Sequence, residues 1–404
     1  MRDGRLSRRS VLAGASAAAL YGGRAAALTL DPALPAGTRA EAILEALPGK
    51  RELIKLSWRP PNYESPLAAF VEPITRNELF FVRYHLAVTP TVLELANWSL
   101  RIGGDAAASA KTLSLDDLKE LEDTEITAVC QCSGNRRGLF NPHVPGVQWG
   151  VGAMGNAIWR GVRLRDVLAL AGVRPGAVEV AFAGADSPVL DATPAFRKSI
   201  PIDRAMDETV LLAWEMNGEK LPIWNGYPVR LIVPGWTGTY WLKHVTEIDI
   251  RSKPFDGFWM QKAYRVPRGL FPVARPFATQ ETDKTSPITE IVVNSLITAP
   301  LDGATVRAGG FEVRGLAWDG GSGIARVEIS LDAGATWAEA ELGDYFGRFA
   351  FQPWSFRVSQ AQAGARTVLA RATNAAGATQ PARLVQNPAG YQHNVIASVG
   401  VTVA

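Results

Sequence analysis

A cysteine followed by two arginines is the pattern in this chain that most clearly suggests chemistry. It lies at residues 129–138, VCQCSGNRRG, after an apolar, strand-like run. A thiolate suits a soft or redox-active metal, and a guanidinium binds oxyanions through a planar fork of donors. A lone cysteine is more often a small buried hydrophobic residue, so the residues alone leave both interpretations open. As a ligand, Cys132 would place a metal beside an anion clamp, which predicts redox chemistry on a small oxyanion.

The loop itself has a predictable shape. Gly134 and Asn135 suit a backbone with positive φ. Cys130 precedes the loop and is expected to be a packed strand residue. A strand would place Cys130 and Cys132 on one face about 7 Å apart, beyond the usual reach of a disulfide.

Two further segments carry candidate anion-binding residues. Residues 80–85, FFVRYH, alternate so that Arg83 and His85 share one strand face, which is either solvated or part of a binding site. Residues 225–244 contain glycine-rich turns around a strand, which let backbone amides approach a ligand. Arg230 and Lys243 in that region could hold a phosphate or a pterin edge, or they could be surface cations of a β-meander.

Together these segments resemble the sulfite oxidase family, whose cofactor cysteine lies in the motif C-x-G-N-R-R and whose pocket includes F-x-V-R-x-H. The resemblance runs from Phe80 to the C-terminus and is strongest toward the bacterial periplasmic sulfite dehydrogenases. It implies one molybdenum-molybdopterin cofactor bound by Cys132, with no haem in this chain. Vertebrate members usually carry histidine where Asn225 stands, so this contact departs from the family pattern.

The resemblance also implies roles for individual residues. Arg83 and Arg137 would hold the dianionic substrate, while His85 and Tyr264 would form hydrogen bonds in the pocket. Tyr264 on its own is one tyrosine among eight and reads as an amphipathic packing residue. Arg136 is expected to support the cofactor from nearby. The residues expected to contact the pterin are Phe81, Val82, Arg83, His85, Asp186, Asn225, Arg230, Trp241 and Lys243.

The implied activity is oxidation of sulfite to sulfate by oxygen-atom transfer, with electrons passed to a separate c-type cytochrome. A homodimer or a heterodimer with a cytochrome subunit is expected. One alternative is a sulfane dehydrogenase subunit that acts on sulfur bound to a carrier protein, which activity on free sulfite would distinguish. Others are a reductase of different oxo-compounds, separable by substrate profiling, and a non-enzymatic exported binding module, which would contain no molybdenum.

Two other motif interpretations are rejected. Residues 150–155, GVGAMG, fit G-x-G-x-x-G, but no strand directly precedes them and no acidic ribose partner follows at the expected distance. They are expected to form a loop over the cofactor, with Gln148 and Trp149 nearby. A cysteine hydrolase using Cys132 and His143 lacks an orienting third residue and leaves the arginines unexplained.

The elements that must position these residues form an α+β pattern. Short apolar strands are expected at 178–182 and 229–233, and helices at 115–121 and 164–171, where apolar residues recur every three or four positions. Ser114 is a predicted helix N-cap. The expected catalytic domain spans residues 80–285, preceded by a proline-rich, extended arm at 28–79.

Residues 286–404 change in character and predict an all-β, immunoglobulin-like sandwich, which the resemblance makes a dimerisation domain. Glycine, aspartate and asparagine turns separate its expected strands. These strands are predicted at 291–293, 311–313, 327–331, 348–351 and 367–372.

The N-terminus predicts export. Residues 7–12, SRRSVL, form a twin-arginine pair followed by an apolar run that is too short to span a membrane. Small residues at 25–27 suit cleavage, so residues 1–27 are expected to be a Tat signal of a periplasmic protein; a frayed polar N-terminus is the simpler alternative. The chain has 404 residues and a net charge of +3. Five arginines and one aspartate in residues 1–27 account for this positive charge. The rest of the chain is therefore not expected to carry a basic surface that binds nucleic acid or membranes.

Overall fold

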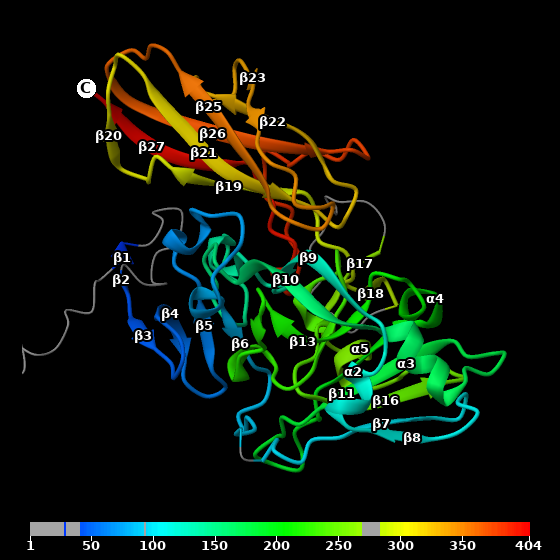
Figure 1. The fold of residues 1–404 in the computed structure, drawn as a ribbon. Helices are drawn as coiled ribbons and strands as arrows, with labels where there is room; N and C mark the ends of the chain where they lie inside the picture. The colour runs from blue at the N-terminus through cyan, green and yellow to red at the C-terminus, as the bar shows by residue number, and fades with distance from the viewer. Residues whose placement is uncertain (1–27, 30–40, 93, 269–282) are drawn as a thin grey trace, which may run out of the picture.

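The computed structural model describes residues 28–29, 41–92, 94–268 and 283–404. The expected export signal at residues 1–27 lies outside this range. The described chain is mostly strands with short helices, arranged as a central domain and a separate sandwich domain (Figure 1). None of its helices is long and apolar enough to cross a membrane.

The first sheet of the central domain carries the cysteine loop. Its strands follow the order β14-β13-β10-β9, and β15 pairs with β13. Strand β9 ends at Gln131, which pairs with the first residue of β10, so the chain leaves the sheet at Cys132. The strands are β9 (Asp123–Gln131), β10 (Met154–Arg163), β13 (Leu211–Met216), β14 (Glu219–Lys220) and β15 (Arg230–Ile232).

The second sheet of the central domain has the order β12-β11-β16-β7-β8. Its strands pair antiparallel except β16 and β7, which are parallel. One continuous hydrophobic core joins this sheet to the first. The strands are β7 (Leu100–Gly103), β8 (Lys111–Leu113), β11 (Glu179–Gly184), β12 (Arg197–Pro201) and β16 (Val245–Arg251).

Both predicted helices are present. Helix α2 (Leu115–Lys119) begins at Ser114, whose hydroxyl accepts from the Asp117 backbone in a capping box. Helix α3 (Leu164–Ala171) buries an apolar stripe against the core and ends at Gly172, whose φ is +69°. Short elements complete the domain: α4 (Ile202–Ala205), α5 (Phe258–Gln261), η3 (Arg137–Leu139), η4 (Ile223–Asn225), η5 (Gly238–Tyr240), β17 (Arg265–Pro267) and β18 (Thr285–Pro287).

The N-terminal segment is more than an extended arm. Its strands form a four-stranded sheet whose last member, β6, belongs to the expected catalytic domain. Leu53, Tyr63 and Val82 form a small core there, which explains why a proline-rich sequence still folds. The elements are β1 (Leu28–Thr29), β2 (Glu41–Ala42), β3 (Leu44–Ala46), β4 (Glu52–Ser57), β5 (Asn62–Glu64), η1 (Leu67–Phe70), η2 (Asn77–Leu79) and β6 (Val82–Arg83).

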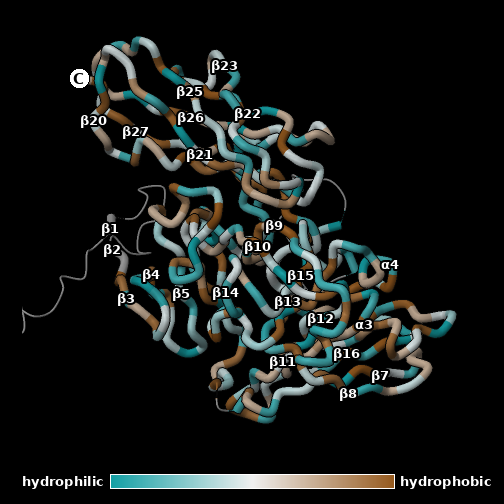
Figure 2. The backbone as a smooth tube through the Cα atoms, in the orientation of Figure 1, coloured by the Kyte–Doolittle hydropathy of each residue, from teal (hydrophilic) through white to brown (hydrophobic). Residues whose placement is uncertain are grey.

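The C-terminal domain is the expected sandwich of two sheets, with orders β19-β21-β25-β24 and β20-β27-β26-β22-β23. Hydrophobic and hydrophilic residues alternate along its strands (Figure 2), and the inward residues form its core. The predictions of strands at 291–293 and 348–351 are wrong, because those residues form loops at the junction with the central domain. The strands are β19 (Asn294–Ala299), β20 (Ala304–Val306), β21 (Phe311–Trp318), β22 (Ile324–Ser330), β23 (Ala338–Glu339), β24 (Glu341–Leu342), β25 (Gln352–Val358), β26 (Gly364–Asn374) and β27 (Ala397–Val403).

Strand β9 and its following loop connect the two domains. An apolar cluster at the junction contains Val129 from β9 and Trp318 from the sandwich. The Trp318 indole donates to Gln131 Oε1 at 2.6 Å. Arg136 donates to Asn294 Oδ1 and to the Ser295 carbonyl, both at 2.7 Å, and is 3% exposed. The Arg136 guanidinium therefore fastens the sandwich domain to the cysteine loop, and its expected role in supporting the cofactor stays a prediction.

Replacing Arg136 with leucine should lower the free energy of unfolding by about 3 kcal/mol, because two buried acceptors lose a charged donor. Urea unfolding of the variant and the wild type measures this. Arg314→Leu, at an exposed position of β21, should change the same quantity by less than about 0.5 kcal/mol. Equal unfolding midpoints for Arg136→Leu and wild type would contradict the assigned role.

Candidate functional site

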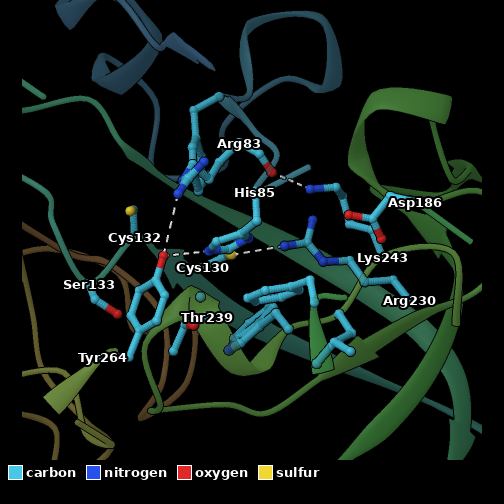
Figure 3. Close-up of a pocket in the computed structure, with 15 residues that line it drawn as sticks. Arg83, His85, Cys130, Cys132, Ser133, Asp186, Arg230, Thr239, Lys243 and Tyr264 are labelled. Carbon is cyan, nitrogen blue, oxygen red and sulfur yellow. Dashed lines mark hydrogen bonds between the residues drawn. The ribbon is translucent and has the colours of Figure 1, made fainter. Parts of the chain in front are cut away.

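One pocket gathers most of the predicted site residues at the edge of the first sheet (Figure 3). They come from segments far apart in sequence: the end of β6, the end of β9, the loops after β11 and η5, and the turn before β17. The lining residues are Phe81, Arg83, His85, Cys130, Cys132, Ser133, Asp186, Phe196, Arg230, Gly238, Thr239, Trp241, Leu242, Lys243 and Tyr264.

The loop after β9 presents the Cys132 thiol to this pocket. The Cys132 amide donates to the Ala153 carbonyl at 2.9 Å, and the Ala153 amide donates to Asn135 Oδ1 at 3.0 Å. These bonds hold the loop against the start of β10. Both cysteines are buried and free, as expected. Cys130 is buried in β9 as predicted, but it also lines the pocket.

The positive φ in this loop falls on Arg136 (φ +65°), and not on Gly134 or Asn135 as predicted. Gly134 is required for a different reason. A Cβ at that position would lie 2.5 Å from an Arg137 guanidinium nitrogen. The glycine therefore makes room for a charged side chain.

Arg83, His85 and Tyr264 form one hydrogen-bonded group in the pocket (Figure 3). The Tyr264 hydroxyl contacts His85 Nε2 and lies 3.4 Å from an Arg83 guanidinium nitrogen. Phe196 stacks on the His85 ring with centroids 3.6 Å apart. Burial, followed by the nearby Arg83 and Lys243 charges, holds the pKa of His85 well below its ordinary value. A neutral His85 can accept a hydrogen bond from the phenol.

A second group surrounds Arg230. Its guanidinium donates to the Asn225 carbonyl at 2.9 Å and to Cys130 Sγ at 3.2 Å. The Lys243 ammonium contacts the Arg83 carbonyl and lies 3.6 Å from the Tyr84 ring centroid. Burial, together with the Arg230 charge, lowers the pKa of Lys243 to about 7. These two cations crowd one another, so an anion placed between them would relieve the repulsion.

The donor set fits an anionic, metal-bearing cofactor. Three cations and one carboxylate line the pocket. The Thr239 hydroxyl and Arg230 Nε are buried and have no hydrogen-bond partner among the described residues, so polar groups are available for a ligand. No three His, Cys, Asp or Glu side chains converge on a metal within the described ranges. A metal at Cys132 would therefore take its remaining ligands from a cofactor.

Three predicted residues do not line the pocket. The Val82 side chain belongs to the core of the N-terminal sheet, because the strand alternation turns it away from Phe81 and Arg83. Asn225 lies behind the pocket lining. Its side-chain Oδ1 accepts from Lys50 Nζ at 2.5 Å, and its backbone carbonyl accepts from Arg230. Arg137 lies outside the lining, where Nε donates to the Ala389 carbonyl at 2.8 Å.

The rejected glycine motif has a structural role. Glu64 accepts from the amides of Gly150 and Gly152 at 2.8 and 2.6 Å. A Cβ at Gly152 would lie 1.9 Å from the Ser65 carbonyl oxygen. These residues therefore pack on the N-terminal sheet and do not form the expected loop over the cofactor. Trp149 nearby is fully buried and contacts the Phe81 ring edge-on.

Residues that support the site and that the sequence did not predict include Lys50, Tyr391 and Phe196, which stacks on His85. Lys50 is buried and donates to the Asn77 and Phe80 carbonyls as well as to Asn225. Tyr391 belongs to the segment before β27 that descends from the sandwich beside β9 (Figure 1). Its ring stacks on Tyr264 with centroids 5.5 Å apart and lies 5.1 Å from the Arg137 guanidinium. An aromatic residue after Gly390 is the sole sequence signal, and it does not predict a contact 127 positions away.

Two family models match the chain. Residues 85–259 match the oxidoreductase molybdopterin binding domain, and residues 285–404 match the Mo-co oxidoreductase dimerisation domain. Mitochondrial sulfite oxidase of Rattus norvegicus is 39% identical over 76% of this chain and 56% of its own length. Sulfite oxidase of Arabidopsis thaliana is 33% identical over 75% of this chain and 79% of its own length. The chain thus spans little more than half the length of the mammalian relatives it matches.

A solved structure agrees with these matches. The sulfane dehydrogenase SoxCD from Paracoccus pantotrophus superposes with a TM-score of 0.71 and 27% identity. The superposition covers 85% of this chain and 84% of that one. The agreement therefore extends over the central and the sandwich domain together.

His244 beside the pocket should make the fold acid-sensitive. Its Nδ1 contacts the Tyr227 carbonyl and its Nε2 the Tyr84 hydroxyl, which suits a neutral ring. Burial lowers its pKa from 6.5 to about 3. Between these values the unfolded chain binds the proton and the folded chain does not. The free energy of unfolding therefore falls as pH drops through this window, by up to about 1.4 kcal/mol per pH unit.

His244→Gln removes one titrating group and should weaken this dependence, while His85 and His393, whose pKa values burial also lowers, keep part of it. Urea unfolding at about pH 7 and about pH 5 measures the difference. His143→Gln, at an exposed position, should keep the acid sensitivity of the wild type. The same loss of stability on acidification in His244→Gln and wild type would refute the assignment.

Proposed function

This chain belongs to the sulfite oxidase family of molybdopterin oxidoreductases, and we propose that it oxidises free sulfite to sulfate. The observation that supports this most is the pocket itself. The Cys132 thiol shares it with three cations and with the hydrogen-bonded pair of His85 and Tyr264. A small dianion fits such a cationic, hydrogen-bonding pocket.

The chain's residues divide the work between cofactor and substrate. Cys132 would hold the metal, while Arg230 and Lys243 would bind the anionic part of the molybdopterin. When bound, this cofactor supplies the two-electron redox centre and the transferred oxygen atom. The Arg83 guanidinium is held by Asn62 Oδ1 at 3.0 Å, so it is oriented before sulfite arrives. Such a fixed cation binds developing charge without reorganisation.

His85 and Tyr264 orient the substrate in this proposal. The phenol lies between the imidazole and the Arg83 guanidinium, so it can donate its one proton either to the neutral imidazole or to a sulfite oxygen. Arg137 adds positive charge from behind Tyr391. Burial raises the pKa of Tyr264, although the Arg83 and Arg137 charges oppose this shift, so the phenol keeps the proton that it can donate.

We also propose the cellular setting. The twin-arginine segment at residues 7–12 supports export to the periplasm. Electrons would pass to a separate c-type cytochrome, since the sequence given contains no C-x-x-C-H haem motif. The match to a dimerisation domain at residues 285–404 supports a dimer.

A second candidate function is oxidation of carrier-bound sulfur. The superposition on a sulfane dehydrogenase over 85% of this chain favours it. Turnover of free sulfite separates the two proposals, because a carrier-dependent enzyme would need its protein-bound substrate.

Cys132→Ser should remove molybdenum and sulfite-dependent ferricyanide reduction together, since a serine hydroxyl is a poor ligand for a soft metal. Metal analysis and the activity assay on protein from a host that makes the cofactor test this. Cys130→Ser should retain molybdenum, because the Cys130 thiol already accepts from Arg230. Stoichiometric molybdenum without sulfite turnover in the wild type would favour the carrier-bound substrate. Wild-type protein without molybdenum would refute the enzyme.

Arg83→Gln should raise the KM for sulfite at least tenfold, because the pocket loses a buried cation that faces the dianion. Steady-state kinetics at constant ionic strength measure it. Arg101→Gln removes an exposed arginine on β7 and should leave KM within a factor of two of wild type. An unchanged KM in Arg83→Gln would eliminate the anion-binding role.

A further inference from the structure

A fully buried lysine lies behind the pocket and has no role so far. Lys198 is on β12, and its side chain is 0% exposed. Within the described part of the chain no carboxylate pairs with it. Burying an ammonium without a carboxylate is costly, so fold stability does not explain a lysine at this position.

Neutral groups satisfy the ammonium. It donates to the Trp259 carbonyl at 2.8 Å, and it lies 4.5 Å from the Tyr240 ring centroid and 5.3 Å from that of Tyr264. A lysine ammonium has three donors. The carbonyl accepts one hydrogen bond, and the two electron-rich rings attract the ammonium through cation–π interactions. None of these partners cancels the charge.

The contacts of Lys198 lead directly to the two residues that form the pocket's hydrogen-bonded pair. Tyr264 presents its ring to the ammonium and its hydroxyl to His85 and Arg83. Trp259 gives its carbonyl to the ammonium, while its ring packs 5.3 Å from the His85 ring. The lysine thus contacts both Tyr264 and the tryptophan that packs against His85.

We propose that Lys198 is a positioning residue of the oxyanion site: it fixes the Tyr264 ring and the Trp259 backbone, and its charge strengthens dianion binding through Tyr264. The inference rests on the proposed oxidation of sulfite and extends it to a residue outside the pocket lining. Burial and the Arg265 charge lower the pKa of Lys198, and an anion in the pocket would favour the charged form. No carboxylate pairs with the ammonium in the described part of the chain, so its field would reach that anion uncancelled. A carboxylate at the same place would have weakened the binding of an anion.

The test compares Lys198→Met with Lys198→Arg in cofactor-loaded enzyme. Methionine keeps much of the volume but not the charge, while arginine keeps the charge. Sulfate affinity, measured by isothermal titration calorimetry, should fall about tenfold in Lys198→Met, and the KM for sulfite should rise by a similar factor. Lys198→Arg should recover most of both. The urea midpoint of Lys198→Met should equal or exceed that of the wild type, which a purely structural lysine would not allow.

The matched control is Lys220→Met. Lys220 lies 4.3 Å from the Tyr227 ring centroid, but it is exposed, so its loss should leave sulfate affinity unchanged. The proposal would be overturned if Lys198→Met bound sulfate as tightly as the wild type, whether or not its urea midpoint is lowered. Wild-type enzyme that binds sulfate but does not oxidise sulfite would refute the proposed function while the affinity comparison still decides the role of Lys198. Wild-type enzyme that binds no sulfate would overturn the role of Lys198 as well.

Discussion

The structure depends on keeping several cations buried around a pocket that holds a single carboxylate. Arg83, Arg230 and Lys243 line the pocket with Asp186. Burying such charges is costly unless they are well solvated by other groups. The chain uses neutral partners for this. The Arg230 guanidinium lies 5.3 and 5.8 Å from the ring centroids of Trp159 and Trp241, and the other cations use carbonyl oxygens and tyrosine side chains. These partners lower the cost of burial without cancelling the positive field that an anionic ligand needs.

The turn after β9 makes the two domains depend on each other. Because Arg136 adopts a left-handed conformation, it and Arg137 leave the loop in different directions. Arg136 binds the first residues of β19, and Arg137 binds the segment around Ala389 that descends from the sandwich. The same loop also presents Cys132. A shift of the sandwich would therefore move the thiol, so this domain is part of the site as well as a candidate surface for dimerisation.

Local sequence signals predicted local structure well. The apolar spacing at 164–171 and the cap at Ser114 are signals carried by neighbouring residues alone, and both predictions were correct. The pocket residues were found through motifs, each of which lies at the end of a strand or in a loop. The residues that lie outside the pocket lining or were not predicted depend on through-space contacts. Val82 pairs with a sheet that the proline-rich arm concealed, and Lys50 and Lys198 carry no motif because their partners are carbonyls and rings from distant segments.

The pocket's polar groups tie cofactor binding to stability. Thr239 Oγ1 and Arg230 Nε have no partner among the described residues, and Lys243 lies close to Arg230, whose charge acts on it. An anion that contacts these groups binds the folded chain and not the unfolded one, so its binding free energy adds to the stability of the fold. Carboxylate partners would have stabilised the chain without the cofactor and competed with it for the same donors. Aromatic faces and carbonyls do neither, which explains why the sequence surrounds its cations with tryptophan and tyrosine and not with aspartate and glutamate.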